Sequence, residues 1–180
     1  MRKLTTEIKW ALVFALVTLA WMVGEKLTGL HSTHIDKHAT YTNFFALPAI
    51  ALYVLALLDK RRNDYGGAMT WKQGFISGLF ITLFVTILSP LTQVITSLLI
   101  TPEFFPNAIA HAVSTGQMTQ AEAEGHFNLA AYIKMGFIGA PVMGLVTSAL
   151  VALFTRKRRP ETREGRVDVV FAEGPKKPAN

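Results

Sequence analysis

Four long apolar blocks, separated by shorter polar connections, set the pattern of hydrophobic and polar positions along this chain. The clearest block runs from Phe75 to Ile100, 26 residues without an Asp, Glu, Lys, Arg or His. A helix needs about 20 apolar residues to cross the hydrocarbon layer of a bilayer, so this block predicts a membrane-spanning helix. We expect an all-α fold, a bundle of four transmembrane helices in a domain of residues 1–155. The four predicted spans are approximately residues 8–27, 41–58, 73–100 and 129–154.

The first block is preceded by Met-Arg-Lys but lacks a small-x-small cleavage site after it, which favours a retained span over a secretory signal.

Hydroxyl and amide side chains recur through the third block at spacings of four and three residues. They are Thr82, Thr86, Ser89, Gln93 and Thr96. This spacing places them along one side of a helix, and Pro90 within the block predicts a kink. We expect this polar stripe to face protein, where helix-to-helix hydrogen bonding is its commonest use. The alternative is that it lines a narrow polar path.

Small residues recur at every fourth position of the last block. They are Gly136, Ala140, Gly144, Ser148 and Ala152, with Pro141 as a second predicted kink. A small helix face lets a neighbouring backbone approach closely, which is how helices pack tightly in lipid. We expect the partner to be the third span, whose polar stripe needs cover; a second copy of the chain is the alternative.

Short helices are predicted in both outer connections. After the first span, Gly29 ends the helix, and Ser32 or Thr33 is positioned to cap a short new one. After the third span, a helix is expected over residues 106–114. The capping-box pattern of residues 119–122 predicts another helix, which we expect to run into the fourth span as part of an outer lid.

The net charge of +6 follows the predicted topology. Fifteen of the 18 basic residues fall on one side of a chain that crosses four times, leaving Lys26, Lys37 and Lys134 on the other. The positive-inside rule then puts both termini in the cytoplasm. The basic excess therefore indicates topology and gives no reason to expect a nucleic-acid partner.

On the inner side, Thr70 is predicted to cap the third helix. Residues 156–180 form a polar tail rich in proline and glycine, which predicts a disordered cytoplasmic segment. Its opening Arg-Lys-Arg-Arg run is expected to lie against anionic lipid headgroups.

All five histidines fall in the outer connections. Four of them and one carboxylate stand at helical spacings and are candidate metal ligands: His31, His34, His38, Glu122 and His126. Imidazole and carboxylate are ligands that Zn²⁺ prefers, so a zinc site between the two outer segments is one hypothesis. Against it, no complete metalloenzyme motif such as H-E-x-x-H is present, and such histidines often only cap helices or pair with acids. Glu25, at the end of the first span, is a further carboxylate close in sequence to these histidines; the alternative is that it pairs with Lys26 or Lys37. No other cofactor is predicted, and the absence of cysteine rules out disulfides and thiolate metal sites.

Several stretches of the chain, taken together, are distinctive. They are WKQGFISG, SPLTQVITS, ITPEFFPN, HIDKHATYTN and ALLDK. In these the chain resembles a bacterial multi-pass membrane family catalogued as domain of unknown function 4199, over about residues 5–155. The resemblance implies a bacterial inner-membrane protein with a helical span domain. It implies no activity and no functional residues.

The sequence favours a non-enzymatic integral membrane protein that acts by packing with itself or with partner membrane proteins. The alternative is a small oligomeric transporter or channel that uses the polar stripe. A third hypothesis is an outer-facing metal-dependent enzyme built on the histidines.

Overall fold

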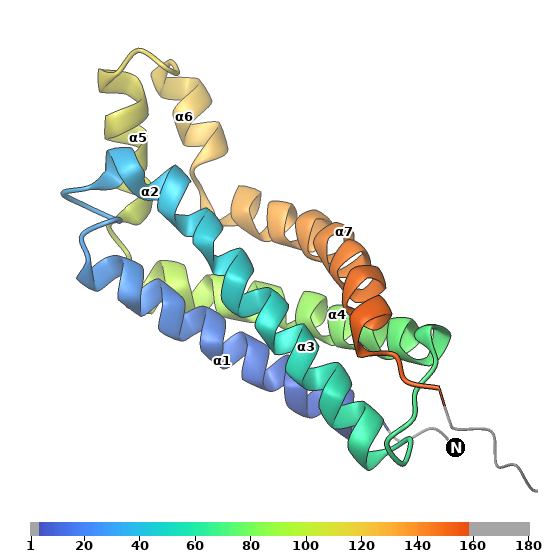
Figure 1. Ribbon diagram of the computed structural model, residues 1–180. Helices are drawn as coiled ribbons and strands as arrows, with labels where there is room; N and C mark the ends of the chain where they lie inside the picture. Colours follow the sequence, from blue (N-terminus) through green and yellow to red (C-terminus); the bar gives the residue numbers. More distant parts are fainter. Residues whose placement is uncertain (1–3, 159–180) are drawn as a thin grey trace, which may run out of the picture.

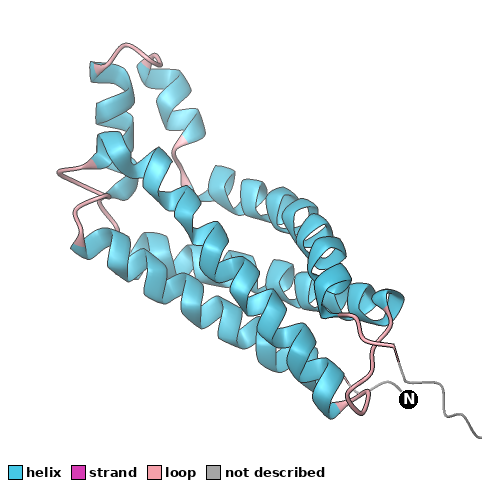
Figure 2. Ribbon diagram, viewed as in Figure 1, coloured by secondary structure: helices cyan, strands magenta, loops and turns pink. Residues whose placement is uncertain are grey.

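Four long antiparallel helices form the body of the protein in a computed structural model that describes residues 4–158. They are α1 (Thr5–Leu27), α3 (Ala46–Asn63), α4 (Trp71–Ile95) and α7 (Leu129–Thr155), and they run side by side (Figure 1). No strand occurs among residues 4–158, where helices are joined by turns and loops and one isolated bridge pairs Met69 with Lys157 (Figure 2). The expected all-α four-helix bundle is therefore confirmed. Most of the tail predicted to be disordered lies outside the described residues.

Short elements extend two of the long helices. Helix α2 (Ile35–Tyr41) and the 3₁₀ turn η1 (Thr42–Phe45) lead directly into α3, so that Ile35–Asn63 is nearly continuous. Helix α4 continues as a π-helical turn, η2 (Thr96–Ile100). The second predicted span therefore begins earlier than expected, because the polar residues before Phe44 also form helical turns.

Two more helices cover the end of the bundle opposite the two termini. They are α5 (Phe104–Ser114) and α6 (Gln120–His126), which stand with α2 at that end (Figure 1). The described chain begins and ends at the other end, as an even number of crossings requires. We call the end with α2, α5 and α6 the histidine end.

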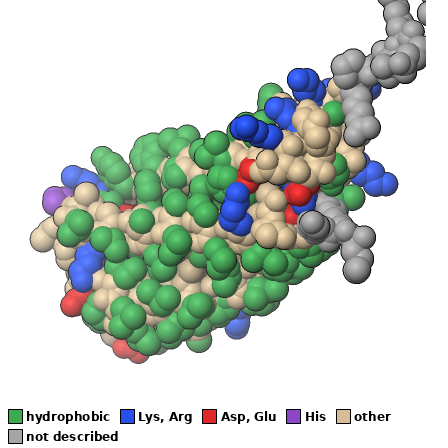
Figure 3. All heavy atoms as spheres, turned by 90° about the horizontal axis from the view of Figure 1, so that it is seen from below, with side chains coloured by type: hydrophobic (Ala, Val, Ile, Leu, Met, Phe, Trp, Pro, Cys, Tyr) green, Lys and Arg blue, Asp and Glu red, His purple; other side chains and the backbone are tan. Residues whose placement is uncertain are grey.

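The chain is a membrane protein by the length and composition of its helices. Four helical segments are long and apolar enough to cross a bilayer: Thr5–Leu27, Ile35–Asn63, Trp71–Ile100 and Leu129–Thr155. Their outward side chains are apolar, with Leu16 66% and Phe154 84% exposed. Hydrophobic side chains cover most of the face in Figure 3, and charged ones gather toward its two ends. Such a surface suits lipid, because an apolar surface of this extent would be unfavourable in contact with water.

Two predicted helix starts are found as expected. Thr70 caps α4 and Thr119 caps α6, each through a complete capping box with the residue three positions later. Each box satisfies backbone N–H groups that a helix start leaves without an intrahelical partner.

Two other local predictions are wrong. Helix α2 begins at Ile35 with His34 as its N-cap and no side-chain cap bond, so neither Ser32 nor Thr33 caps it. Helix α6 does not run into α7: the helix ends at His126, and Asn128 caps a new one by accepting a hydrogen bond from the Ala131 N–H at 2.8 Å. An Asn side chain that accepts a hydrogen bond from the backbone N–H three residues later is typical of a helix start, so the chain begins a new helix here.

Helices α4 and α7 pack at very short range through small residues. A Cβ added to Gly78 would lie 2.5 Å from Ser148 Oγ, and one added to Gly74 would lie 3.2 Å from Ala152 Cβ. A Cβ added to Gly144 would lie 2.8 Å from Thr82 Cβ and closer still to the other atoms of that side chain. A side chain at Gly78 or Gly144 would therefore force Ser148 or Thr82 to move, and one at Gly74 would require its neighbours to give way slightly.

The remaining small residues of α7 lie farther from α4. Gly136 is half-buried with Ser89 Oγ 3.8 Å from an added Cβ, and Ala140 is also half-buried. The closest approach of the two helices therefore lies toward the termini, around Gly144, Ser148 and Ala152.

A buried ion pair ties the helices at the terminal end of the bundle. Lys60 Nζ on α3 lies 2.9 Å from Glu7 Oε2 on α1 and 2.8 Å from Asp64 Oδ2. Glu7 is 0% and Lys60 2% exposed. A charge buried in this way is stable only when it is paired, so the pair fixes α1 against α3 at this end. The sequence analysis did not identify it.

Candidate functional site

Three side chains at the histidine end converge to form a compact cluster, which we call the triad: Glu25, His31 and His38. His31 Nε2 lies 3.0 Å and His38 Nε2 3.5 Å from the same carboxylate oxygen, Glu25 Oε2. One donor atom from each of the three residues falls within 4.8 Å of the other two. Glu25 and His31 are buried, and the His38 side chain is 19% exposed.

A tight turn after α1 brings His31 back onto Glu25. Gly29 ends the helix with φ of +77°, a left-handed conformation that a side chain disfavours. An added Cβ there would also lie 2.5 Å from Thr33 Oγ1. The Leu30 N–H donates back to the Glu25 carbonyl at 3.0 Å, so the next residue, His31, is folded over the end of α1.

Neighbouring side chains hold the triad from several directions. The Trp21 indole Nε1 donates to Glu25 Oε1 at 2.6 Å, which leaves Oε2 for the histidines. Asn107 of α5 donates to the His31 carbonyl at 2.9 Å. The Phe104 ring packs on both imidazoles, with centroids 5.1 Å from His31 and 4.8 Å from His38. Groups that are anchored in this way lose little freedom when a ligand binds.

A small pocket of about 170 Å³ adjoins the two imidazoles. Its other walls carry polar groups from the end of α4, the π-helical turn and the loop after it: Gln93, Thr96, Ser97 and Thr101. π-helical turns frequently occur at functional sites because they re-aim side chains out of helical register. The pocket therefore joins the end of the predicted polar stripe to the histidines.

Two buried polar atoms beside this pocket have no hydrogen-bond partner within the described part of the chain: His31 Nδ1 and Thr101 Oγ1. Leaving such an atom unsatisfied costs about 1–3 kcal/mol, so a polar ligand or water is expected beside it. A water needs about 30 Å³, and the pocket is large enough for several.

The rest of the polar stripe is satisfied within the protein. Thr82 Oγ1 donates to the Gly78 carbonyl at 2.9 Å and bonds to Tyr53 Oη at 2.8 Å. Thr86 and Ser89 donate to carbonyls one turn back in their own helix. Thr82 and Thr86 are buried, so this part of the stripe is covered by neighbouring helices, as packing requires.

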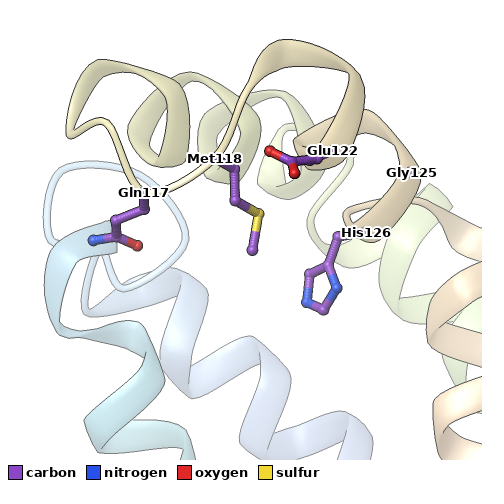
Figure 4. A pocket seen from close by; sticks show the side chains of 5 residues that line it. All are labelled: Gln117, Met118, Glu122, Gly125 and His126. Carbon is purple, nitrogen blue, oxygen red and sulfur yellow. The ribbon is translucent and has the colours of Figure 1, made fainter.

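The other predicted metal ligands do not join the triad. His34 is exposed, with its Nδ1 3.2 Å from Thr33 Oγ1. Glu122 serves its own capping box: its carboxylate accepts from the Thr119 N–H and hydroxyl, which holds the pKa of this exposed group below its usual range. His126 points with Met118 into an open hollow beside α6 (Figure 4). Of the five predicted ligands, only His31 and His38 come together.

Glu25 lies with two of the histidines near it in sequence, and the alternative pairing with Lys26 or Lys37 is wrong. Its carboxylate contacts Trp21, His31 and His38. The available signal was the order Glu25, Gly29, His31: a glycine turn after a terminal carboxylate folds the following residues back onto it. Thr101, the first residue after the π-helical turn, gave no signal in the sequence.

The triad offers one carboxylate and two imidazoles. Among the described residues, these three side chains lie close enough together to hold a metal ion. Imidazole nitrogen together with carboxylate oxygen favours first-row transition metals, zinc first, over Mg²⁺ or Ca²⁺. Without a metal, the same contacts form a buried acid–histidine pair.

A family model described as "Protein of unknown function (DUF4199)" matches residues 9–157. No curated protein and no solved structure matches the chain. The match covers α1 through α7 and so includes the whole triad. The protein therefore belongs to the DUF4199 family, a family of unknown function.

Proposed function

We propose that this membrane protein binds a divalent transition-metal ion, Zn²⁺ before others, through Glu25, His31 and His38. The observation that carries the proposal is the convergence of three donor atoms within 4.8 Å from the end of α1, the following turn and α2. The residues around them, Trp21, Asn107 and Phe104, hold the donors in place.

The distances are close to those that zinc requires. Tetrahedral Zn²⁺ with bonds of about 2.0–2.1 Å places neighbouring ligand atoms about 3.3 Å apart. The two imidazole-to-carboxylate distances are 3.0 and 3.5 Å. His38, whose side chain at 19% is the most exposed of the three, is the ligand we expect to adjust when the ion binds.

Three protein ligands leave a fourth tetrahedral position. Both imidazoles line the pocket with Gln93 and Thr101, so the fourth ligand is expected to be a water or small polar molecule held there. The unpartnered His31 Nδ1 would donate to a second water in the same pocket, as metal-bound histidines usually donate through the other ring nitrogen.

In this proposal the bundle itself is a non-enzymatic scaffold, located in a bacterial inner membrane with both termini cytoplasmic. The distribution of basic residues supports that orientation, in which the triad lies on the outer side. The internal hydrogen bonds of Thr82, Thr86 and Ser89 favour helix packing over a transport path through the stripe. Packing with itself or with partner membrane proteins is the role we assign to the lipid-facing helices.

The metal site is tested by titrating the purified full chain with Zn²⁺ in a calorimeter. We expect one ion per chain bound at micromolar or lower concentration. His38→Ala removes one of three ligands and should weaken binding at least tenfold. Glu25→Gln should weaken it similarly, because an amide replaces the only anionic ligand.

His34→Ala is the matched control, since it removes an exposed histidine of the same segment that lies outside the triad. It should leave zinc affinity unchanged, as should His126→Ala. No binding at micromolar Zn²⁺, or equal losses in His34→Ala and His38→Ala, would refute the proposal.

The orientation is tested with introduced cysteines, because the chain has none of its own. Gln117→Cys, between α5 and α6, should react with a membrane-impermeant maleimide in intact cells, or in spheroplasts where an outer membrane blocks the reagent. Asn63→Cys, at the end of α3, should react only after the membrane is opened. The opposite pattern would place the triad in the cytoplasm.

A further inference from the structure

A groove of about 500 Å³ runs along the outside of the bundle beside the triad. One wall is the last three turns of α1, including Val17, Ala20 and Gly24, and the other includes Leu30 and Phe44. The groove lies within the size range of small-molecule sites, about 300–1,000 Å³. It shares no lining residue with the polar pocket at Gln93 and is therefore distinct from it.

The groove lies on the part of the surface that faces lipid. Its wall on α1 belongs to a segment long and apolar enough to cross a bilayer. Leu16 and Leu27, which flank this wall, are 66% and 81% exposed, and Phe44 is 52% exposed. What fills an apolar groove at this depth must therefore come from the membrane or from another membrane protein.

The length of the groove corresponds to one leaflet. From Val17 to Thr28 the helix rises about 16 Å, at 1.5 Å per residue. Half of the hydrocarbon thickness of a bilayer is about 15 Å. The groove therefore extends from near the middle of the membrane to the interface at the histidine end.

The polarity of the groove changes along this length. Val17 and Ala20 line the deep part, and the polar members, Glu25, Thr28 and Tyr41, all lie toward the histidine end. An amphiphile with one polar end and one long apolar chain has the same distribution. A helix from a second copy of this chain is the other candidate occupant, and the experiment below distinguishes the two.

We propose that this groove holds one acyl chain of a phospholipid from the leaflet at the histidine end, with the headgroup at the level of Thr28 and Tyr41. Glu25 lines the same end of the groove, so a phospholipid headgroup is the membrane component nearest to the proposed metal. The lipid site itself does not require the metal, and it holds whichever side of the membrane the histidine end faces.

Gly24 allows a direct test, because it lines the groove and an added Cβ would have no atom within 4 Å. Gly24→Leu therefore fills the groove without straining the fold. Gly139→Leu is the matched control: it makes the same change in α7, also with no atom within 4 Å, and lies outside the groove.

The experiment uses the full chain in phosphatidylethanolamine–phosphatidylglycerol vesicles that contain a phospholipid with a diazirine on its acyl chain. After illumination, the adducts are mapped by mass spectrometry. We expect them to concentrate on residues 17–24 and 41–44, and to fall at least threefold in Gly24→Leu but not in Gly139→Leu. Ala20→Phe, a second groove-filling variant, should give the same loss.

Two results would overturn the proposal. The first is labelling spread evenly over the exposed residues of all four long helices and unchanged in both groove-filling variants. The second is a dimer that cross-links through Gly24→Cys and is dispersed when Ala20→Phe is added to that variant, which would make a second copy the occupant. Zinc titration does not depend on lipid labelling, so failure of either proposal can be recognised separately.

Discussion

Replacing Gly144 by alanine should destabilise the bundle far more than the same replacement at Gly139 in the same helix. The new Cβ at Gly144 would lie 2.8 Å from Thr82 Cβ and closer to Thr82 Oγ1 and Cγ2, whereas at Gly139 it meets no atom within 4 Å. Thr82 cannot simply rotate away, since its hydroxyl bonds to both Tyr53 and the Gly78 carbonyl.

The size of the effect can be estimated from these contacts. Overpacking by one methyl group in a tight interface costs about 1–3 kcal/mol. Displacing the buried Thr82–Tyr53 hydrogen bond costs about 1 kcal/mol more. The change itself favours the helix by up to about 1 kcal/mol, and that gain is common to both sites. We therefore expect Gly144→Ala to be less stable than Gly139→Ala by about 2–4 kcal/mol.

The assay is reversible unfolding in mixed micelles, with the detergent composition varied and helicity followed by circular dichroism. Thr82→Ala in the Gly144→Ala background removes the two closest atoms, so the double variant should recover part of the loss. The coupling between the two sites should be about 0.5–3 kcal/mol. Equal stability of Gly144→Ala and Gly139→Ala would refute the close packing of α4 and α7.

Three further predictions concern the ends of the bundle. Lys60→Met removes the ammonium group that pairs with the buried Glu7 carboxylate, and it should lower the free energy of unfolding by about 3–5 kcal/mol. Part of this loss should be recovered in the double variant Glu7→Gln, Lys60→Met, which no longer buries an unpaired charge. The Lys60 hydrogen bond holds the pKa of Asp64 below its ordinary 3.8, so Asp64 stabilises the fold fully above about pH 5 and progressively less as pH falls below 3.8 through the lower pKa of the folded state. Thermal unfolding of Asp64→Asn should accordingly depend less on pH between 5 and 3 than that of the wild type; an identical dependence would contradict the assignment. Thr119→Ala removes the cap of α6 at a cost of about 1 kcal/mol, and it should speed amide hydrogen exchange over residues 120–126 about fivefold, with unchanged rates in α7 as the internal control.

The helices could be predicted because their signals are local. The length of the charge-free run through Ile100 identifies a span, and Thr70 and Thr119 identify helix starts through residues only three positions away. The boundary at Asn128 was missed because the capping-box helix was assumed to continue. A capping Asn just before the apolar block indicated a new start.

The site could be predicted only in part, because its contacts join separate elements. Helical spacing suggested His34 with His38, but α2 begins after His34, and the turn at Gly29 brings His31 to the cluster in its place. Whether Glu25 meets the histidines depends on the direction of that turn, which no helical pattern encodes. The Glu7–Lys60 pair was missed for the same reason: the two residues are 53 positions apart and meet only when α1 packs on α3.

X-ray absorption at the zinc edge of the purified, zinc-loaded full chain is the most direct test of the central claim. The triad predicts about four nitrogen and oxygen ligands at about 2.0–2.1 Å, with the outer-shell scattering of two imidazoles. A six-oxygen shell without imidazole scattering would mean that zinc is not held by His31 and His38.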